Sequence, residues 1–110
     1  MKINLEILQK YVTNKLISVR QHPTLPLLIW NYTNATQFGW KWDEHTMFAR
    51  GLITDLEGNI VSKSFTKFFD VGQDVSTKLE NLPAELPVIT EKVDGSLISV
   101  LNYEGNLVVA

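Results

Sequence analysis

The chain has no cysteine, only two histidines and no long apolar run among its 110 residues. The absence of cysteine excludes a disulfide scaffold, a thiolate metal site and a cysteine nucleophile. His22 and His45 form no HExxH motif, so we expect no zinc site and assign no residue to a metal. No segment approaches the roughly 18 apolar residues of a membrane span. The N-terminus also lacks the pattern of a secretory signal, so we expect a cytoplasmic protein without a membrane partner.

Charge and composition are close to those of a soluble domain. Hydrophobic residues make up 45% and charged residues 20%, and the net charge is −2. This balance excludes a disordered chain and a generally basic surface that binds nucleic acid without specificity. The first 50 residues nevertheless carry more Lys and Arg than Asp and Glu. That half could face a polyanion, although scattered lysines are more often ordinary solvated surface.

Hydrophobic periodicity predicts an α+β fold, with an N-terminal helix followed by an antiparallel β-sheet. Residues 3–19 carry apolar side chains at three- and four-residue steps, and Pro23 lies beyond the expected end of this helix. From about residue 27 onward the pattern is mainly β, with a helical turn near 74–80. We expect strands at 27–33, 48–54, 60–65, 87–93, 96–101 and 107–110, with turns at 55–59, 94–95 and 103–106.

The segment Glu91-Lys92-Val93-Asp94-Gly95 supports two interpretations. As local structure, Asp94-Gly95 is a tight hairpin turn and Lys92 a solvated lysine. As chemistry, Lys-x-Asp-Gly suits covalent nucleotidyl transfer, in which a lysine amine attacks a nucleotide α-phosphate. An unperturbed lysine is neutral only about 0.04% of the time at pH 7, so the reaction needs desolvation or neighbouring cations. We expect Lys92 at the end of a buried strand, where it is partly desolvated.

Two further segments precede this motif, Arg50-Gly51 and Lys67-Phe68-Phe69. The ordered trio resembles the N-terminal part of ATP-dependent RNA ligases of the bacteriophage RNA ligase 1 type. The resemblance covers roughly residues 27–110 and is strongest from 48 to 100. It implies the first part of a nucleotidyltransferase, an ATP-grasp-like ligase adenylation domain, over residues 1–110. The Lys-x-Asp-Gly motif alone would also be compatible with a DNA ligase or an mRNA-capping guanylyltransferase.

The resemblance also implies roles for single residues. Lys92 corresponds to the nucleophile that carries AMP, and Arg50 and Lys67 to the cations that hold the triphosphate and the leaving pyrophosphate. Further nucleotide contacts are expected from Glu91, Asp94, Gly95 and Phe69, with Phe68 in the core. The alternatives are that Arg50 pairs with Asp55 or Glu57 and that Lys67 is a surface lysine. Trp30, Trp40 and Trp42 could stack bases, but we expect them in the core.

The implied reaction uses ATP and Mg²⁺ to adenylate the lysine, transfers AMP to an RNA 5′-phosphate and seals it to a 3′-hydroxyl. The family's later catalytic cations and carboxylates have no counterpart after Lys92, where no lysine or arginine follows. We therefore expect the 110 residues alone to be weakly active or inactive. The alternative from another class is a non-catalytic interaction module that self-associates through an open sheet edge. A viral origin would place the protein in the host cytoplasm.

Overall fold

The computed structural model describes all 110 residues and begins with helix α1 (Leu5–Thr13). Asn4 caps this helix, because its side chain accepts hydrogen bonds from the backbone N–H groups of Glu6 and Ile7. The helix is shorter than the predicted 3–19, since Lys15 adopts a positive φ of 62° and a strand follows. Leu16 and Val19 fit a helical period, but Ile17 and Val19 are β-branched and also fit a strand. The pairing of this segment with the next strand decides between helix and strand.

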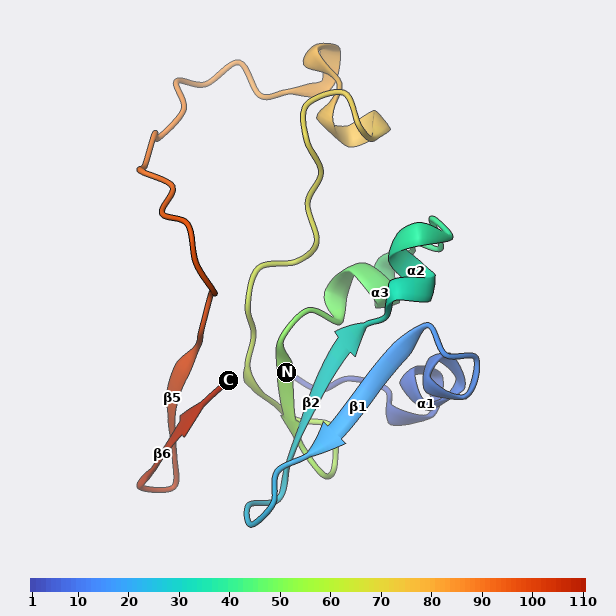
Figure 1. Cartoon of the computed structure of the whole chain (residues 1–110), viewed down its shortest axis with the longest axis vertical. Helices are drawn as coiled ribbons and strands as arrows, with labels where there is room; N and C mark the ends of the chain where they lie inside the picture. Colours follow the sequence, from blue (N-terminus) through green and yellow to red (C-terminus); the bar gives the residue numbers. More distant parts are fainter. The chain divides into compact units, whose positions relative to one another are not determined.

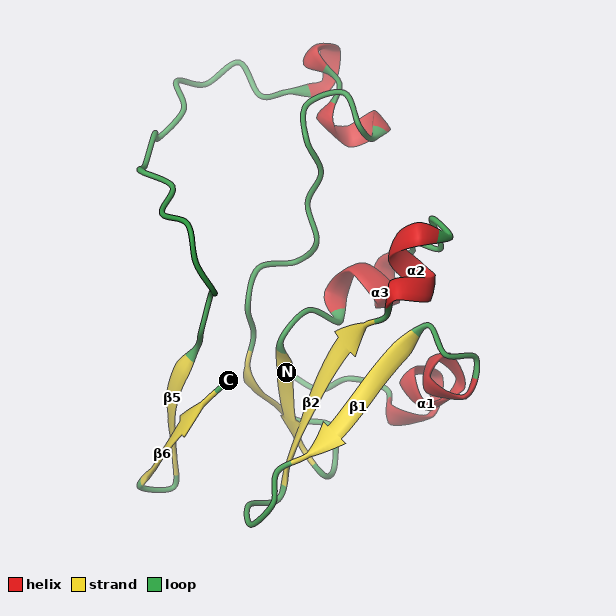
Figure 2. Cartoon of the chain, in the orientation of Figure 1, coloured by secondary structure: helices red, strands yellow, loops and turns green.

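Four antiparallel strands form the main sheet in the order β1-β2-β3-β4 (Figures 1 and 2). Their bounds are β1 (Ile17–Gln21), β2 (Leu27–Tyr32), β3 (Leu52–Asp55) and β4 (Ile60–Ser62). Trp30 on β2 pairs with Val19 on β1 and with Leu52 on β3. One core cluster joins Leu8 of α1 to the sheet through Ile17, Trp30, Ala49 and Leu52. The predicted α+β class, with an N-terminal helix and an antiparallel sheet, is confirmed.

Residues 34–48 depart from the predicted β pattern. They form two short helices, α2 (Asn34–Phe38) and α3 (Glu44–Phe48). Thr33 and Asp43 cap them, and both cap side chains accept a backbone N–H of the first turn. Phe38 ends α2, and Trp40 and Trp42 lie in the turn between the two helices.

Two predicted turns are confirmed. Gly58, with φ of 96°, closes the loop from β3 to β4, and a Cβ there would lie 2.9 Å from the Ile3 carbonyl oxygen. Strands β5 (Val100–Tyr103) and β6 (Asn106–Val109) form a separate two-stranded sheet. Glu104 and Gly105 between them both have positive φ, as a two-residue hairpin turn requires. Val108 packs with Leu27 and Ile53 in a second core cluster.

The chain divides into two units, one of residues 1–67 and 99–110, the other of residues 68–98. The second unit contains two short 3₁₀ helices, η1 (Val75–Thr77) and η2 (Leu79–Asn81), where a helical turn was predicted. Its residues 83–98 form no strand, so the predicted strand at 87–93 is wrong and the one at 96–101 is reduced to β5. A strand needs a paired neighbour, and neither sheet includes these residues. No helix in the structure has the length and apolar character of a membrane span.

Candidate functional site

Two cationic side chains, those of Arg50 and Lys63, lie beside the short segment that follows β4, and Lys67 belongs to that segment. Arg50 Nη1 lies 3.5 Å from the carbonyl oxygen of Thr66, a long hydrogen bond. Lys63 Nζ donates hydrogen bonds to Thr66 Oγ1 at 2.7 Å and to the Ser64 carbonyl at 3.0 Å. The Lys67 backbone N–H donates to the Met47 carbonyl at 3.0 Å, which ties this segment to α3. We call Arg50, Lys63 and Lys67 the cation cluster.

The electrostatics of the cation cluster favour an anion. Burial, together with the positive charge of Arg50, lowers the pKa of the Lys63 amine. The contacts of this amine are neutral: a hydroxyl, a carbonyl and the Phe48 ring, whose centroid lies 4.6 Å away. A bound anion would offset the repulsion between Lys63 and Arg50. Phosphate oxygens suit such a site, because Arg binds them bidentately and Lys supplies a movable charge.

Gly51 explains why Arg50 lies where it does. Its φ is 61°, and a Cβ at this position would lie 3.3 Å from Ser64 Cβ. Its N–H donates a 2.7 Å hydrogen bond to Asn31 Oδ1 on β2. Glycine therefore allows the chain to turn sharply from α3 into β3 beside Ser64. The Arg50-Gly51 pair was found from the sequence, whereas Asn31 was not, because no local pattern marks it.

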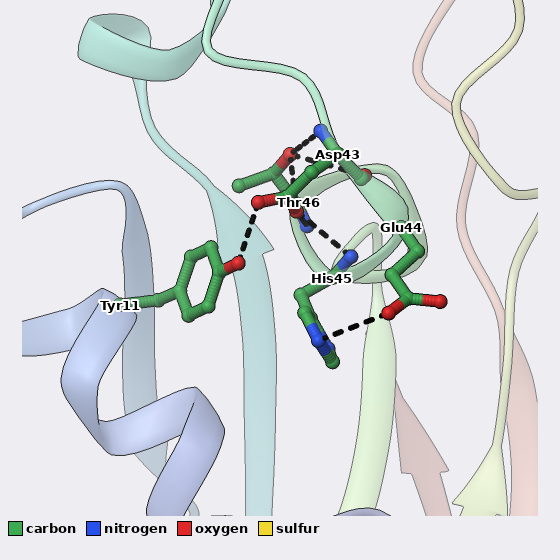
Figure 3. Close-up of polar contacts among 5 residues, drawn as sticks. All are labelled: Tyr11, Asp43, Glu44, His45 and Thr46. Atoms are coloured by element: carbon green, nitrogen blue, oxygen red, sulfur yellow. Dashed lines mark hydrogen bonds and ion pairs between the residues drawn. The ribbon is translucent and has the colours of Figure 1, made fainter.

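Figure 3 shows the polar contacts that join α1 to the start of α3. The Tyr11 hydroxyl donates a hydrogen bond to Asp43 Oδ2 at 2.5 Å. Asp43 Oδ1 accepts the backbone N–H groups of His45 and Thr46, both at 2.9 Å, and the Asp43 N–H donates to Thr46 Oγ1. His45 Nε2 lies 3.4 Å from Glu44 Oε1. This capping box fixes the helix whose C-terminal end leads directly to Arg50.

The pKa values of Tyr11 and Asp43 shift in opposite directions. The hydrogen bond to Asp43, with a contribution from burial, raises the pKa of Tyr11 to about 12. Burial alone would raise the pKa of Asp43, but hydrogen bonds from Tyr11 and from the Thr46 and His45 backbone outweigh it and lower the pKa. The pair is therefore held as a neutral phenol and a charged carboxylate.

Aromatic side chains border the cation cluster. Lys67 Nζ lies 5.4 Å from the centroid of a Trp42 ring, and Trp42 meets Tyr32 edge-on at 4.8 Å.

The predicted core position is confirmed for Trp30, which is 2% exposed, and is wrong for Trp40, which is 50% exposed. Asp55, an acidic residue considered as a partner of Arg50, accepts hydrogen bonds from the backbone N–H groups of Glu57 and Asn59 within its own turn.

The predicted nucleophile segment belongs to the other unit. Glu91, Lys92, Asp94 and Gly95 are exposed and lie outside any strand. The expectation that Lys92 ends a buried strand is therefore wrong, because the strand pair on which it depended does not form. Gly95 does have a positive φ of 144°, with open space around the position of a Cβ. The structure thus brings Arg50 and Lys67 into one unit and describes Lys92 in the second.

The burial of the two phenylalanines after Lys67 contradicts the prediction for Phe68. Phe68 was expected in the core but is 63% exposed, whereas Phe69 is 8% exposed. Consecutive residues of an extended chain point to opposite sides, so only one of the two can be buried. The sequence alone does not say which of the two phenylalanines is buried.

The nucleotide-binding roles of Phe69, Glu91, Asp94 and Gly95 stay predictions. No local sequence pattern marks Lys63, because its position beside Arg50 depends on the pairing of β3 with β4.

Comparison with known proteins identifies the family. A family model described as "RNA ligase", of the phage RNA ligase 1 type, matches residues 48–110, which include the cation cluster and the Lys92 segment. A curated protein of Thermovibrio ammonificans named "Putative RNA ligase" is 36% identical over 50 residues, or 46% of this chain and 13% of that protein. The chain thus matches a small part of that relative's length. No solved structure matches significantly. The match over more than half of its residues shows that the chain belongs to the RNA ligase family of the bacteriophage RNA ligase 1 type.

Proposed function

We propose that the protein is an ATP-dependent RNA ligase in which Lys92 is the covalent nucleophile. The neutral Lys92 amine attacks the α-phosphate of ATP and loses a proton to solvent. A phosphorus–nitrogen bond forms, and the bond from the α-phosphorus to the bridging oxygen of pyrophosphate breaks. AMP then passes from the lysine to the 5′-phosphate of an RNA. Attack by a 3′-hydroxyl forms the phosphodiester and releases AMP.

The observation that carries this proposal is the contact of Arg50 and Lys63 with Thr66, the residue before Lys67, within the region that the family match covers. In the proposed reaction these cations hold the β- and γ-phosphates and stabilise the charge that develops on pyrophosphate. Positioned cations of this kind are worth roughly 3–4 kcal/mol each in the transition state. Lys63 is thus proposed as a third phosphate-binding cation, in addition to Arg50 and Lys67.

The second unit supplies the remaining proposed contacts. Glu91 and Asp94 flank the proposed nucleophile in the sequence, Gly95 would let backbone approach the nucleotide closely, and Phe69 matches a family aromatic near the site. These roles rest on the family resemblance, as does the proposal that residues 1–110 are the first part of a nucleotidyltransferase adenylation domain. We likewise propose RNA with 5′-phosphate and 3′-hydroxyl ends as the substrate of the whole protein.

Magnesium fits the chain only as a partner of the nucleotide. No cluster of three or more His, Cys, Asp or Glu side chains in the chain could hold a metal ion. Mg²⁺ commonly keeps most of its ligands from phosphates and water, so the lack of a protein cage is compatible with Mg²⁺ bound to ATP. Its chemistry would be neutralisation of phosphate charge. The residues of the chain do not define a separate metal site.

The test is covalent labelling of the full gene product with α-labelled ATP and Mg²⁺, followed by denaturing electrophoresis. We expect a labelled band with ATP that disappears in Lys92→Ala and Lys92→Arg and persists in Lys78→Ala, a lysine that is also exposed in the second unit. Labelling with GTP in place of ATP would indicate a capping guanylyltransferase. Labelling that survives loss of Lys92 would contradict the proposal. We expect the 110 residues alone to label far more weakly.

A specific observation also favours a second candidate, a non-catalytic interaction module. Large apolar side chains of the second unit are exposed, among them Leu86, Val88, Ile89 and Val93. An exposed apolar segment with alternating side chains can add as a strand to another chain. Stable assembly with a second chain, measured by sedimentation, without any nucleotide labelling would support this candidate against the ligase.

A further inference from the structure

The turn between α2 and α3 presents three aromatic rings. Phe38, the last residue of α2, is 82% exposed, and Trp40 is half exposed. Trp42 meets Trp40 edge-on, with centroids 6.4 Å apart and an interplanar angle of 88°. We call Phe38, Trp40 and Trp42 the aromatic turn. Single exposed apolar side chains are ordinary, but neighbouring exposed rings on one turn indicate a contact surface.

Hydrogen bonds hold the backbone of the aromatic turn on both sides. The buried Thr36 donates its hydroxyl to the Leu16 carbonyl at 2.6 Å. The N–H of Gly39 donates to Ala35 and that of Lys41 to Thr36, at 3.0 Å and 2.9 Å. On the far side, the Asp43 capping box fixes the start of α3. The rings are therefore presented by an ordered backbone, which lowers the entropy cost of binding a ligand.

Trp40 adopts a backbone conformation that bulky residues rarely take. Its φ is 51°, in the left-handed region that favours glycine or asparagine. In this conformation half of the Trp40 surface stays exposed. Strain of this kind is concentrated at binding surfaces, where the side chain serves a ligand.

Positive charge borders the aromatic turn. Lys41 lies between the two tryptophans in the sequence and is exposed. The Lys15 carbonyl accepts a 2.7 Å hydrogen bond from the hydroxyl of Thr33, so exposed Lys15 lies beside the start of α2. Residues 33–42 contain no Asp or Glu. Rings flanked by lysines suit a polyanion with exposed base faces, because bases stack on the rings while phosphates meet the lysines.

We propose that the aromatic turn binds single-stranded RNA, with bases stacked on Trp40 and Phe38 and with Lys41 and Lys15 facing phosphates. This inference rests on the proposed function, in which RNA is the substrate. The family match begins at residue 48 and so does not include these residues. Paired bases keep their faces within the helix, so double-stranded RNA should bind less well than single-stranded RNA.

The test measures the affinity of the chain for a short fluorescein-labelled single-stranded RNA by fluorescence anisotropy. We expect Trp40→Ala and Phe38→Ala each to weaken binding about tenfold, and Trp40→Phe to retain most of it. Leu56→Ala is the matched control, since Leu56 is an exposed apolar residue in the β3–β4 loop. Lys41→Gln should reduce the salt dependence of binding. Circular dichroism of each variant checks that its fold is retained.

Affinity that is unchanged in both Trp40→Ala and Phe38→Ala would overturn the proposal, as would a wild-type chain that does not bind the RNA. A change of oligomeric state in Trp40→Ala without loss of RNA affinity would also overturn it, because the surface would then be a protein interface. Nucleotide labelling of Lys92 is independent of RNA. Labelling without Trp40-dependent RNA binding therefore contradicts only this inference, and Trp40-dependent binding without labelling contradicts only the proposed adenylation.

Discussion

Tyr11 on α1 donates a hydrogen bond to Asp43, the residue that caps α3. This contact joins two elements that are 32 residues apart in the sequence. Because α3 leads into Arg50 and Gly51, the contact links the N-terminal helix to the backbone that places the cation cluster. We therefore regard α1 as part of the framework of the candidate site.

Replacing Tyr11 with Phe removes this hydrogen bond and leaves the ring. We expect the free energy of unfolding to fall by about 1 kcal/mol, because the pair is partly exposed and its net contribution is modest. Urea denaturation followed by tryptophan fluorescence measures the change. Tyr103→Phe in β5 is the matched control, and equal effects of the two substitutions would contradict the role given to the Tyr11 hydroxyl.

The same pair predicts a dependence of stability on pH. The folded pKa of Asp43 is lowered, so its contribution is present above the usual carboxyl range and is lost as the pH falls through the folded value. The folded pKa of Tyr11 is raised from 10.0 to about 12, so its contribution is present below pH 10.0 and is lost as the pH rises towards 12. The stability difference between wild type and Tyr11→Phe should be constant between about pH 5 and 9 and should shrink outside that window. A difference that stays constant to pH 11 would contradict the assignment.

Lys63→Gln tests the third member of the cation cluster. Removing a charged donor from a phosphate site should weaken binding of ATP about tenfold, with little effect on the fold. Binding of a fluorescent ATP analogue at several salt concentrations measures this effect, and Lys78→Gln in the second unit is the control. Affinity that is equal in the two variants would remove Lys63 from the proposed site.

Gly51→Ala tests whether the backbone at this position places Arg50. A left-handed φ costs a residue with a Cβ about 1–2 kcal/mol, and the new methyl group would press on Ser64. We expect lower stability and weaker ATP binding together. Gly72→Ala carries a similar backbone strain in open space, so it should reduce stability locally without changing ATP affinity. A Gly51→Ala variant with normal ATP affinity would show that Arg50 does not depend on this turn.

The sequence predicted the features that depend on local chemistry. The turns at Gly58 and at Glu104-Gly105 follow from their glycines, which adopt positive φ without steric cost, and the Arg50-Gly51 and Lys67 segments follow from family motifs. The helix end at Thr13 was not predictable, because Leu16 to Val19 satisfy both periods and only pairing with β2 decides between them. Lys63 and Asn31 were missed for a related reason: their proximity to Arg50 and Gly51 arises from pairing across β2, β3 and β4.

In the second unit the sequence predicted strands that do not form. Val88, Ile89 and Val93 have the composition of strands, and the Asp94-Gly95 turn favours a hairpin, yet residues 83–98 pair with neither sheet. Strand propensity reflects packing against neighbours more than a preference of the backbone. The position of Lys92 was therefore predicted from a pairing that local sequence cannot guarantee.

The central claim is that Lys92 becomes covalently linked to AMP. Mass spectrometry of peptides from the full gene product after reaction with ATP and Mg²⁺ tests it most directly. We predict that one AMP group is found on the peptide containing Lys92, through a bond that acid cleaves and mild alkali does not, as a phosphoramidate requires. AMP attached to another residue, or no AMP on a folded protein that binds ATP, would contradict the claim.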